Sequence, residues 1–267
     1  MSNYTRESHT VETPDGVKLS TRVFKPKEEI KDNNLVIVLV HPYSVLGGCQ
    51  ALLKGMASGL ADKGYRAVTF DMRGVAGSTG SASLTGFAEV KDVVAVCNWV
   101  SQNLSSDKIL LVGSSAGAPI AGSAVDQIEQ VVGYVSLGYP FGMMASILFG
   151  RHHKAILQSP KQKLFVMGTR DGFTSVKQLK NKLQSAAGRN ETHLIEGVSH
   201  FEMEGPAYDA QMVNLILEFI ASLTLNLEGG LVSMLSNQSE NVGSTELGCN
   251  QMNKIKEKRR EQSEQTI

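Results

Sequence analysis

The stretch Gly113–Gly117, which reads G-S-S-A-G, constrains the fold more than any other part of the chain. It follows the apolar run Ile109–Val112 and precedes small residues that suit a helix from about Ala118. A strand that turns into a helix within so few residues strains its central residue, and glycine on either side avoids side-chain collisions there. The pattern predicts a buried strand, a sharp turn centred on Ser115, and a helix whose first amides favour negative charge.

Predicted strands and helices alternate along the chain after an N-terminal hairpin. Ser8–Lys25 alternates polar and apolar residues around a Pro-Asp-Gly turn, which predicts a β-hairpin. Mainly apolar runs predict strands at Leu35–Val40, Tyr65–Phe70, Ile109–Val112, Val131–Leu137, Lys163–Met167 and His193–Ile195. Helices are predicted between and after these strands, at Ala51–Lys63, Phe87–Asn103, Ala118–Ile128, Ser175–Ala186 and Pro206–Leu223. This rhythm predicts an α/β fold, a mostly parallel, twisted sheet with helices on both faces and ligands at the C-terminal ends of its strands.

The same pattern predicts one domain over residues 1–225, followed by a polar tail. Residues 226–267 have few apolar side chains, so we expect them to be disordered. Five basic residues crowd into seven positions of this tail: Lys254, Lys256, Lys258, Arg259 and Arg260. Such a run is typical of a nuclear-import or anionic-surface patch or of a solvated tail, and the glutamates around it favour the solvated tail.

Composition excludes several classes of partner. The 26 lysines and arginines balance 26 aspartates and glutamates, so no nucleic acid is expected as a partner. No apolar run approaches membrane-spanning length and the N-terminus is polar, so we expect a cytoplasmic protein without a membrane span. The three cysteines, Cys49, Cys97 and Cys249, lack metal-ligand spacing, and Cys97 is expected in the core.

Ser115 requires a base, and that base an orienting acid, before it can act as a nucleophile. Asp171 follows the predicted strand Lys163–Met167, and His200 follows the strand His193–Ile195. Both therefore lie at strand ends on the side where Ser115 emerges, in the chain order Ser, acid, His. The alternatives are a small turn residue for Ser115, a helix cap for Asp171 and a surface histidine for His200.

A tetrahedral intermediate needs two donors for its oxyanion. The Ala116 backbone N–H supplies one, and the loop after Leu35–Val40 is expected to supply the other through Tyr43, with Ser44 as the fallback. In the same loop, His41 is expected to fix the backbone rather than to react.

Other polar clusters are assigned structural roles. The glycine cluster Gly74, Gly77 and Gly80 lacks the spacing of a phosphate cradle, so no cofactor is predicted. His152 and His153 lack further ligands at metal spacing, so they are expected at the surface and no metal site is predicted. An Asp71–Arg73 contact is expected to brace the loop that follows the second parallel strand.

From about Val11 to Leu223 the sequence resembles the α/β-hydrolase superfamily, especially small hydrolases without a cap. Their H-P-H-P-x-x-G-G loop corresponds to H-P-Y-S-V-L-G-G from His41, with Tyr-Ser in place of His-Pro. Their D-x-R-G-x-G-x-S-x-G segment corresponds to D-M-R-G-V-A-G-S-T-G from Asp71. The resemblance implies a catalytic triad of Ser115, Asp171 and His200 and acyl transfer to water, without specifying a substrate.

Many relatives insert a lid between the strands that correspond to Val131–Leu137 and Lys163–Met167. Here the stretch Tyr139–Pro160 is predicted to be irregular and is too short for a lid of several elements. Its apolar side chains either pack as a buried helix or line an apolar acyl pocket. The second possibility favours a carboxylesterase acting on small, mainly apolar esters or thioesters. A hydrolase-derived receptor with little turnover, a serine peptidase and a protein-interaction module remain alternatives, and the oligomeric state is open.

Overall fold

The computed structural model describes residues 2–28, 30, 34–42 and 47–224. The chain divides into two units, residues 1–219 and 220–267, and of the second only the helical residues 220–224 are described. The predicted tail, its basic run and the oxyanion candidates Tyr43 and Ser44 therefore lie outside the described residues. Among the helices searched within these ranges, none combines the length and apolarity that a membrane crossing requires.

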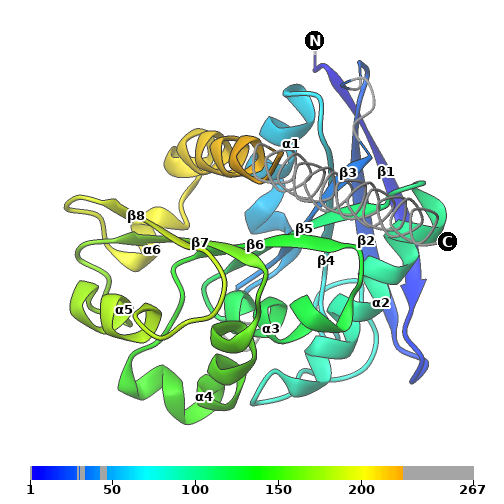
Figure 1. Cartoon of the computed structure of the whole chain (residues 1–267). Helices are drawn as coiled ribbons and strands as arrows, with labels where there is room; N and C mark the ends of the chain where they lie inside the picture. Colours follow the sequence, from blue (N-terminus) through cyan, green and yellow to red (C-terminus); the bar gives the residue numbers. More distant parts are fainter. Residues whose placement is uncertain (1, 29, 31–33, 43–46, 225–267) are drawn as a thin grey trace, which may run out of the picture. The chain divides into compact units, whose positions relative to one another are not determined.

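A sheet of eight strands forms the centre of the first unit, in the order β1-β2-β4-β3-β5-β6-β7-β8 (Figure 1). All neighbouring pairs from β4 to β8 in this order are parallel, which confirms the predicted α/β fold. The strands are β1 Tyr4–Glu12, β2 Lys18–Pro26, β3 Leu35–Val40, β4 Arg66–Phe70, β5 Lys108–Ser114, β6 Val131–Leu137, β7 Gln162–Gly168 and β8 Asn190–Ile195. Sequence reasoning located every one of these strands, most within one or two residues of its ends.

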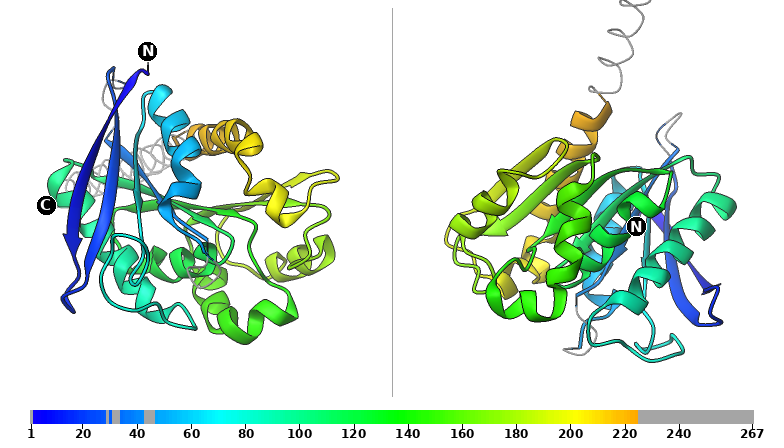
Figure 2. Two further views of the ribbon diagram at one scale, coloured as in Figure 1. Left: turned by 180° about the vertical axis from the view of Figure 1, so that it is seen from behind. Right: turned by 60° about the horizontal axis from the view of Figure 1, so that its bottom comes forward.

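The two edges of the sheet differ. The predicted hairpin forms one edge, where β1 pairs with β2 and β2 pairs antiparallel with β4. The parallel strand β8 forms the other edge, and Figure 2 shows the blue hairpin and the yellow-green β8 at opposite ends of the sheet. Between the edges, β3 is buried at all six positions, as its unbroken apolar run predicts for a strand covered on both faces.

Helices cover both faces of the sheet (Figure 1). The α-helices are α1 Lys54–Asp62, α2 Phe87–Asn103, α3 Gly117–Ala124, α4 Met143–Gln158, α5 Val176–Leu183 and α6 His200–Met203. Single 3₁₀ turns stand at η2 Gln50–Leu53, η3 Val125–Gln127 and η4 Pro206–Tyr208, and a further helix begins at residue 209. The helix α1 lies on one face and α2 and α3 on the other (Figure 1). Gly55 and Gly59 of α1 allow Asp209 and Val213 to approach its backbone closely, because a Cβ at either glycine would collide with those side chains.

The connection between β6 and β7 contains one long helix, α4, so the prediction of an irregular segment at Tyr139–Pro160 is wrong. Its apolar residues do not form a single stripe. Ile156 is buried in the core, whereas Met143 and Ile147 are 81% and 74% exposed. Because these apolar residues face the core and the solvent in turn, they do not recur on one face of the helix, which is the pattern that predicts a helix from sequence. The prediction that no lid of several elements is present is confirmed.

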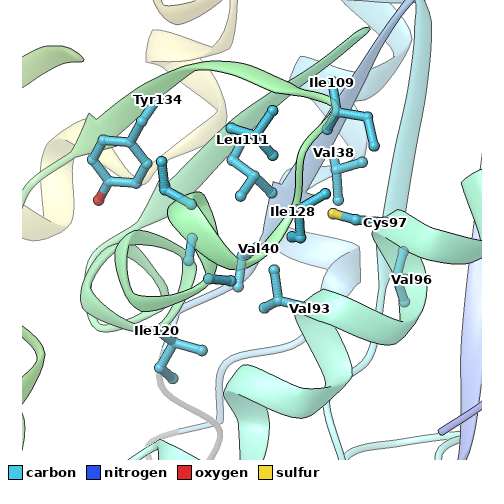
Figure 3. Packing of buried hydrophobic residues seen from close by; sticks show 14 of the residues in the cluster. Val38, Val40, Val93, Val96, Cys97, Ile109, Leu111, Ile120, Ile128 and Tyr134 are labelled. Atoms are coloured by element: carbon cyan, nitrogen blue, oxygen red, sulfur yellow. The ribbon is translucent and has the colours of Figure 1, made fainter. Parts of the chain in front are cut away.

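The core lies where α2 and α3 pack on the centre of the sheet. Figure 3 shows side chains of α2 facing those of β3 and β5, with Ile120 of α3 beside them. Cys97 is fully buried in this layer, and burial raises the pKa of its thiol, so the prediction of an inert core cysteine is confirmed. This packing fixes β5 and α3, the two elements that flank Ser115, and the neighbouring strand β3.

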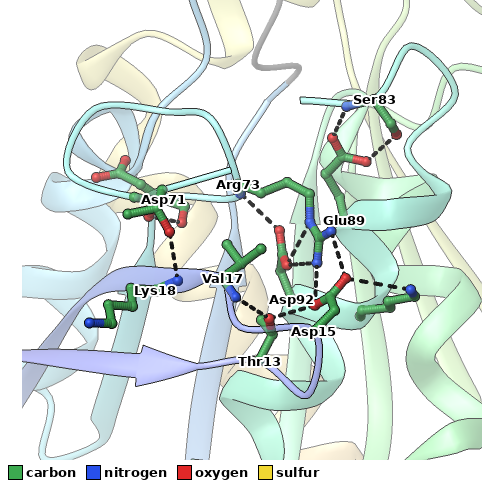
Figure 4. Close-up of polar contacts among 12 residues, drawn as sticks. Thr13, Asp15, Val17, Lys18, Asp71, Arg73, Ser83, Glu89 and Asp92 are labelled. Atoms are coloured by element: carbon green, nitrogen blue, oxygen red, sulfur yellow. Dashed lines mark hydrogen bonds and ion pairs between the residues drawn. The ribbon is translucent and has the colours of Figure 1, made fainter. Parts of the chain in front are cut away.

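Arg73 braces the loop after β4 through different partners from the predicted one. Its guanidinium binds Asp92 of α2, at 2.7 Å from Nη2, and Asp15 of the hairpin turn, at 3.0 Å from Nη1 (Figure 4). Hydrogen bonding to Arg73 lowers the pKa of Asp15. Asp71 instead binds the backbone N–H and the side-chain amide of Gln50, at 2.9 and 2.6 Å. The predicted Asp71–Arg73 contact is therefore wrong, because Asp92 is completely buried and has Arg73 as its cationic partner.

Candidate active site

Ser115 lies on the sharp turn between β5 and α3. Its φ of +50° places it in the left-handed region, which costs free energy for a residue other than glycine. The turn is possible because the backbone packs tightly around both flanking glycines. A Cβ at Gly117 would overlap the His41 carbonyl oxygen, and one at Gly113 would collide with the start of α3. The strained turn predicted from G-S-S-A-G is present.

His200 reaches Ser115 from the loop after β8. This loop turns at Gly197, whose φ is +74°, and His200 then begins the short helix α6. Ser199 and Glu202 form a capping box that holds the start of this helix. The His200 Nε2 atom lies 2.7 Å from the Ser115 Oγ atom, and the His200 side chain is 3% exposed. His200 is therefore a buried residue of this cluster and not a surface histidine.

Asp171 completes the cluster from the loop after β7. Its Oδ2 atom lies 2.6 Å from His200 Nδ1, and its Oδ1 atom accepts the backbone N–H groups of Phe173 and Thr174 at 2.7 and 2.9 Å. The carboxylate is thus held on one side by the backbone and directed at the imidazole on the other. The alternative role as a helix cap is wrong, since Ser175 caps α5.

The proton positions follow from these partners. A carboxylate only accepts hydrogen bonds, so Asp171 accepts a hydrogen bond from the N–H at Nδ1 of His200. The Nε2 atom is then the free acceptor, and the hydroxyl of Ser115 donates to it. This is the arrangement that moves a proton from a serine hydroxyl to an imidazole during nucleophilic attack.

The loop that follows β3 is tied at both ends to the segment after β4. At its start, the fully buried His41 donates from Nδ1 to the Pro42 carbonyl, at 2.6 Å, and accepts the Met72 N–H on Nε2, at 3.0 Å. At its end, Gln50 binds Asp71. Burial lowers the pKa of His41, which keeps its ring neutral in this role. His41 therefore fixes the start of the loop, as predicted, and its carbonyl oxygen lies against Gly117 at the start of α3.

Ala116 presents a backbone N–H at the N-terminal end of α3, where the helix dipole favours negative charge. Within the described ranges this N–H has no acceptor. Because it directly follows Ser115, it is suited to a negatively charged oxygen that forms on the atom attacked by Oγ. Tyr43, predicted as the second donor, lies outside the described residues.

A pocket of about 540 Å³ opens at Ser115. Its lining is mainly apolar and comes from the loop after β3, the segment after β6, α4, the loop after β7 and the α6 region. The described lining residues are Pro42, Gly47, Gly48, Leu52, Ser115, Ala116, Pro140, Ala145, Leu148, Phe149, Phe173, Phe201 and Glu204. Both alternatives for the apolar insert thus hold in part, because α4 is a helix and three of its described side chains line the pocket.

Known proteins resemble this chain in both sequence and structure. A model of the X-Pro dipeptidyl-peptidase (S15) family matches residues 15–131, which include Ser115. An α/β serine hydrolase homologue from Coxiella burnetii is 27% identical and superposes with a TM-score of 0.67, over 82% of this chain and 97% of that one. The chain belongs to the α/β serine hydrolase superfamily.

Two further solved structures share the fold of this hydrolase. An α/β serine hydrolase without a lid from Xanthomonas campestris is 24% identical, with a TM-score of 0.65 over 78% of this chain and 91% of that one. An esterase from Pyrococcus furiosus is 17% identical, with a TM-score of 0.66 over 82% of this chain and 93% of that one. At these identities the likeness concerns the fold alone, and it agrees with the single helix between β6 and β7.

Sequence reasoning missed several residues of the pocket, including its charged residue, Glu204. It follows α6, and its Oε1 atom lies 3.6 Å from His200 Nε2. Burial raises the pKa of this carboxyl and the charge of Asp171 adds to the rise, whereas His200 and Ser115 oppose it. The spacing of four residues after the predicted base could have indicated Glu204, because such residues share one face of a helix.

The two histidines of α4 are buried in the hydrolase, so the prediction that they lie at the surface is wrong. His152 bonds the Ser123 hydroxyl and the Thr85 carbonyl, at 2.6 and 2.7 Å, and stacks on Phe87 at 4.1 Å between ring centroids. His153 is 5% exposed and burial lowers its pKa to about 4. In the part of the chain that the structure describes, no group of three or more His, Cys, Asp or Glu residues could hold a metal ion.

Proposed function

We propose that this chain is a serine hydrolase that cleaves small, mainly apolar carboxylic esters or thioesters. The observation that carries the proposal is the cluster Ser115–His200–Asp171, joined by contacts of 2.7 and 2.6 Å, at the mouth of an apolar pocket. The roles are nucleophile for Ser115, general base for His200 and orienting acid for Asp171.

The first half-reaction forms an acyl-enzyme. Ser115 Oγ attacks the carbonyl carbon while its proton passes to His200 Nε2, and the former carbonyl oxygen becomes an oxyanion. The Ala116 N–H binds that oxyanion, and we propose Tyr43, or Ser44 in its place, as the second donor. The bond to the alcohol oxygen or thiol sulfur then breaks, and the leaving group takes the proton from Nε2.

The second half-reaction returns the enzyme to its starting state. Water gives one proton to Nε2 while its oxygen attacks the acyl carbon, and Ser115 recovers the proton as the carboxylic acid departs. No cofactor or metal is needed for either step, since each proton removed by His200 is returned by it.

The pocket supports an apolar substrate. Most of its described lining is aliphatic or aromatic, and no lysine or arginine is among those residues. Burial of apolar surface therefore supplies the binding free energy, and an anionic substrate finds no countercharge there. Esters with short to medium apolar acyl groups suit this lining.

Labelling and turnover of two neighbouring serine variants test the proposal. Ser115→Ala should abolish labelling by a fluorophosphonate and lower kcat for p-nitrophenyl esters by about 10³-fold or more. Ser114→Ala is the matched control, because this buried serine ends β5 next to Ser115, while Ser115 is the serine hydrogen-bonded to His200. Labelling that survives in Ser115→Ala and disappears in Ser114→Ala would refute the assignment. Labelling without steady turnover across esters of graded chain length would identify a ligand receptor instead.

A peptidase is the second candidate, because the matching family model is that of the X-Pro dipeptidyl-peptidases. That match ends at residue 131 and so includes Ser115 but neither Asp171 nor His200. We expect kcat/KM for p-nitrophenyl butyrate to exceed that for Gly-Pro p-nitroanilide. The reverse order would favour the peptidase.

A further inference from the structure

Glu204 places one carboxylate inside an otherwise apolar pocket, beside the reacting atoms. Its Oε1 atom is 3.6 Å from His200 Nε2, is buried, and has no hydrogen-bond partner in the described part of the chain. The side chain as a whole is 16% exposed and lines the pocket. The carboxylate therefore faces the space that a bound substrate would occupy.

Three other buried carboxylates of this chain are hydrogen-bonded within the protein. Asp92 binds Arg73, and Glu89 binds the backbone N–H and the hydroxyl of Ser83. Asp171 binds His200 and two backbone amides. A buried carboxylate without such partners destabilises the folded state. Within the described residues, the buried Oε1 atom of Glu204 has no such hydrogen bond, which leaves it available to a charged group on the substrate.

The surroundings of Glu204 indicate the chemistry of that partner. Phe173 and Phe201 lie beside His200, with ring centroids 4.6 and 5.5 Å from the imidazole, and their own centroids are 5.7 Å apart at 86°. Among the described lining residues Glu204 is the single charged one. A carboxylate supplies countercharge, and aromatic rings attract a weakly hydrated cation. Together they suit an alkylammonium group.

The position next to Nε2 determines which half of the substrate carries the cation. His200 gives its proton to the leaving group, so in the proposed reaction the alcohol half lies against Nε2 and within reach of Glu204. We propose that Glu204 binds an ammonium group on the alcohol half of the substrate, so that amino-alcohol esters are preferred over neutral esters of the same shape. This inference rests on the proposed function, because the leaving group is placed by the role of His200.

The test compares two substrates that differ only in charge. Acetylthiocholine and 3,3-dimethylbutyl thioacetate have the same shape, with a quaternary nitrogen in one and a carbon in the other. In wild type, kcat/KM should favour the cationic ester by about tenfold or more, since opposite charges about 4 Å apart attract strongly even with partial screening. In Glu204→Gln the ratio should fall to near one.

Glu202→Gln is the matched control for Glu204→Gln. Glu202 is exposed, lies two residues away, and caps Ser199 through an oxygen that glutamine retains. This variant loses the same charge but should keep the wild-type ratio. A wild-type ratio near one, or a ratio that persists in Glu204→Gln, would overturn the inference. Equal losses on both esters in Glu204→Gln would also overturn it, because they would indicate a structural role.

Binding separates failure of this inference from failure of the proposed function. If no ester is hydrolysed, the proposed function fails. Calorimetric titration of the wild-type protein with choline and 3,3-dimethylbutanol then tests whether Glu204 binds a cation. Tighter binding of choline that is lost in Glu204→Gln would support the cation site. Equal binding of the two alcohols would overturn it.

Discussion

At the scale of single residues, the two carboxylate oxygens of Asp171 bind different partners. Oδ1 is held by the amides of Phe173 and Thr174, which leaves Oδ2 facing His200 Nδ1. In Asp171→Asn the same amides would hold the side-chain oxygen and turn its NH₂ group toward the imidazole. Nδ1 would then have to accept, and the proton would move to Nε2, where it blocks removal of the Ser115 proton.

We therefore expect Asp171→Asn to lower kcat by about 10³–10⁴-fold while the fold persists. Ester hydrolysis measures the rate, and circular dichroism with thermal melting checks the fold. Asp107→Asn, at an exposed position before β5, provides the control and should retain activity. Near wild-type turnover in Asp171→Asn would mean that another acid orients His200.

Glu204 makes the preference for a cationic substrate depend on pH. Burial raises the pKa of this carboxyl, with Asp171 adding to the rise and His200 and Ser115 opposing it. Below that pKa the side chain is neutral and the two thioester isosteres should react alike. Above it the carboxylate is charged, so the ratio of their kcat/KM values should rise, with a midpoint above the ordinary value of glutamate.

A ratio is the right measurement, since any effect of pH that both substrates share cancels. Profiles of both isosteres from pH 4.5 to 8 would show the rise in wild type and its absence in Glu204→Gln. A wild-type ratio that stays high and constant down to pH 4.5 would contradict the raised pKa.

At the scale of elements, one buried lysine fastens β7 to its surroundings. Lys163 is fully buried, and its Nζ atom donates to the carbonyl oxygens of Ser159, Lys161 and Ala187 at 2.7, 2.8 and 2.7 Å. These contacts connect the start of β7 to the loop after α5. Because the loop with Asp171 follows β7, they also stabilise the strand that places the orienting acid.

Lys163→Met keeps the length of the side chain but leaves three carbonyl groups without a donor. We expect a loss of about 2–4 kcal/mol in the free energy of unfolding. The Tm should fall by roughly 5–15 °C. Lys180→Met, on the exposed face of α5, should melt within about 2 °C of wild type. Calorimetry of both variants provides the comparison, and an unchanged Tm for Lys163→Met would show that water replaces the lysine.

The elements that sequence could predict are those whose side chains follow a regular pattern of burial. The run Leu35–Val40 is buried on both faces and so identifies β3 unambiguously. The helix α4 could not be recognised in this way, because its side chains face the core, the pocket and solvent in turn. The same limit applies to Glu204 and Arg73, whose partners come from tertiary packing rather than from neighbours in the sequence. The closeness of Ser115, Asp171 and His200 could be expected because each follows a recognisable strand within about five residues.

At the scale of the whole molecule, the site depends on strands of unequal burial. Ser115 follows β5 at the centre of the sheet, whereas His200 follows β8, which among the described strands pairs only with β7. All six residues of β3 are buried, but Ile195 is the single buried residue of β8. Edge segments with little buried surface open at a lower free-energy cost than core strands do.

Partial unfolding should consequently abolish activity before the sheet melts. As urea increases, ester hydrolysis should be lost at a lower concentration than the far-ultraviolet signal, because fraying of β8 removes His200 from Ser115 while the other strands remain paired. Coincident curves would show instead that β8 opens only with the whole sheet. During refolding the order reverses, and hydrolysis should recover only after the central strands have formed. An edge strand of the sheet, rather than its centre, then determines how long an active molecule stays active.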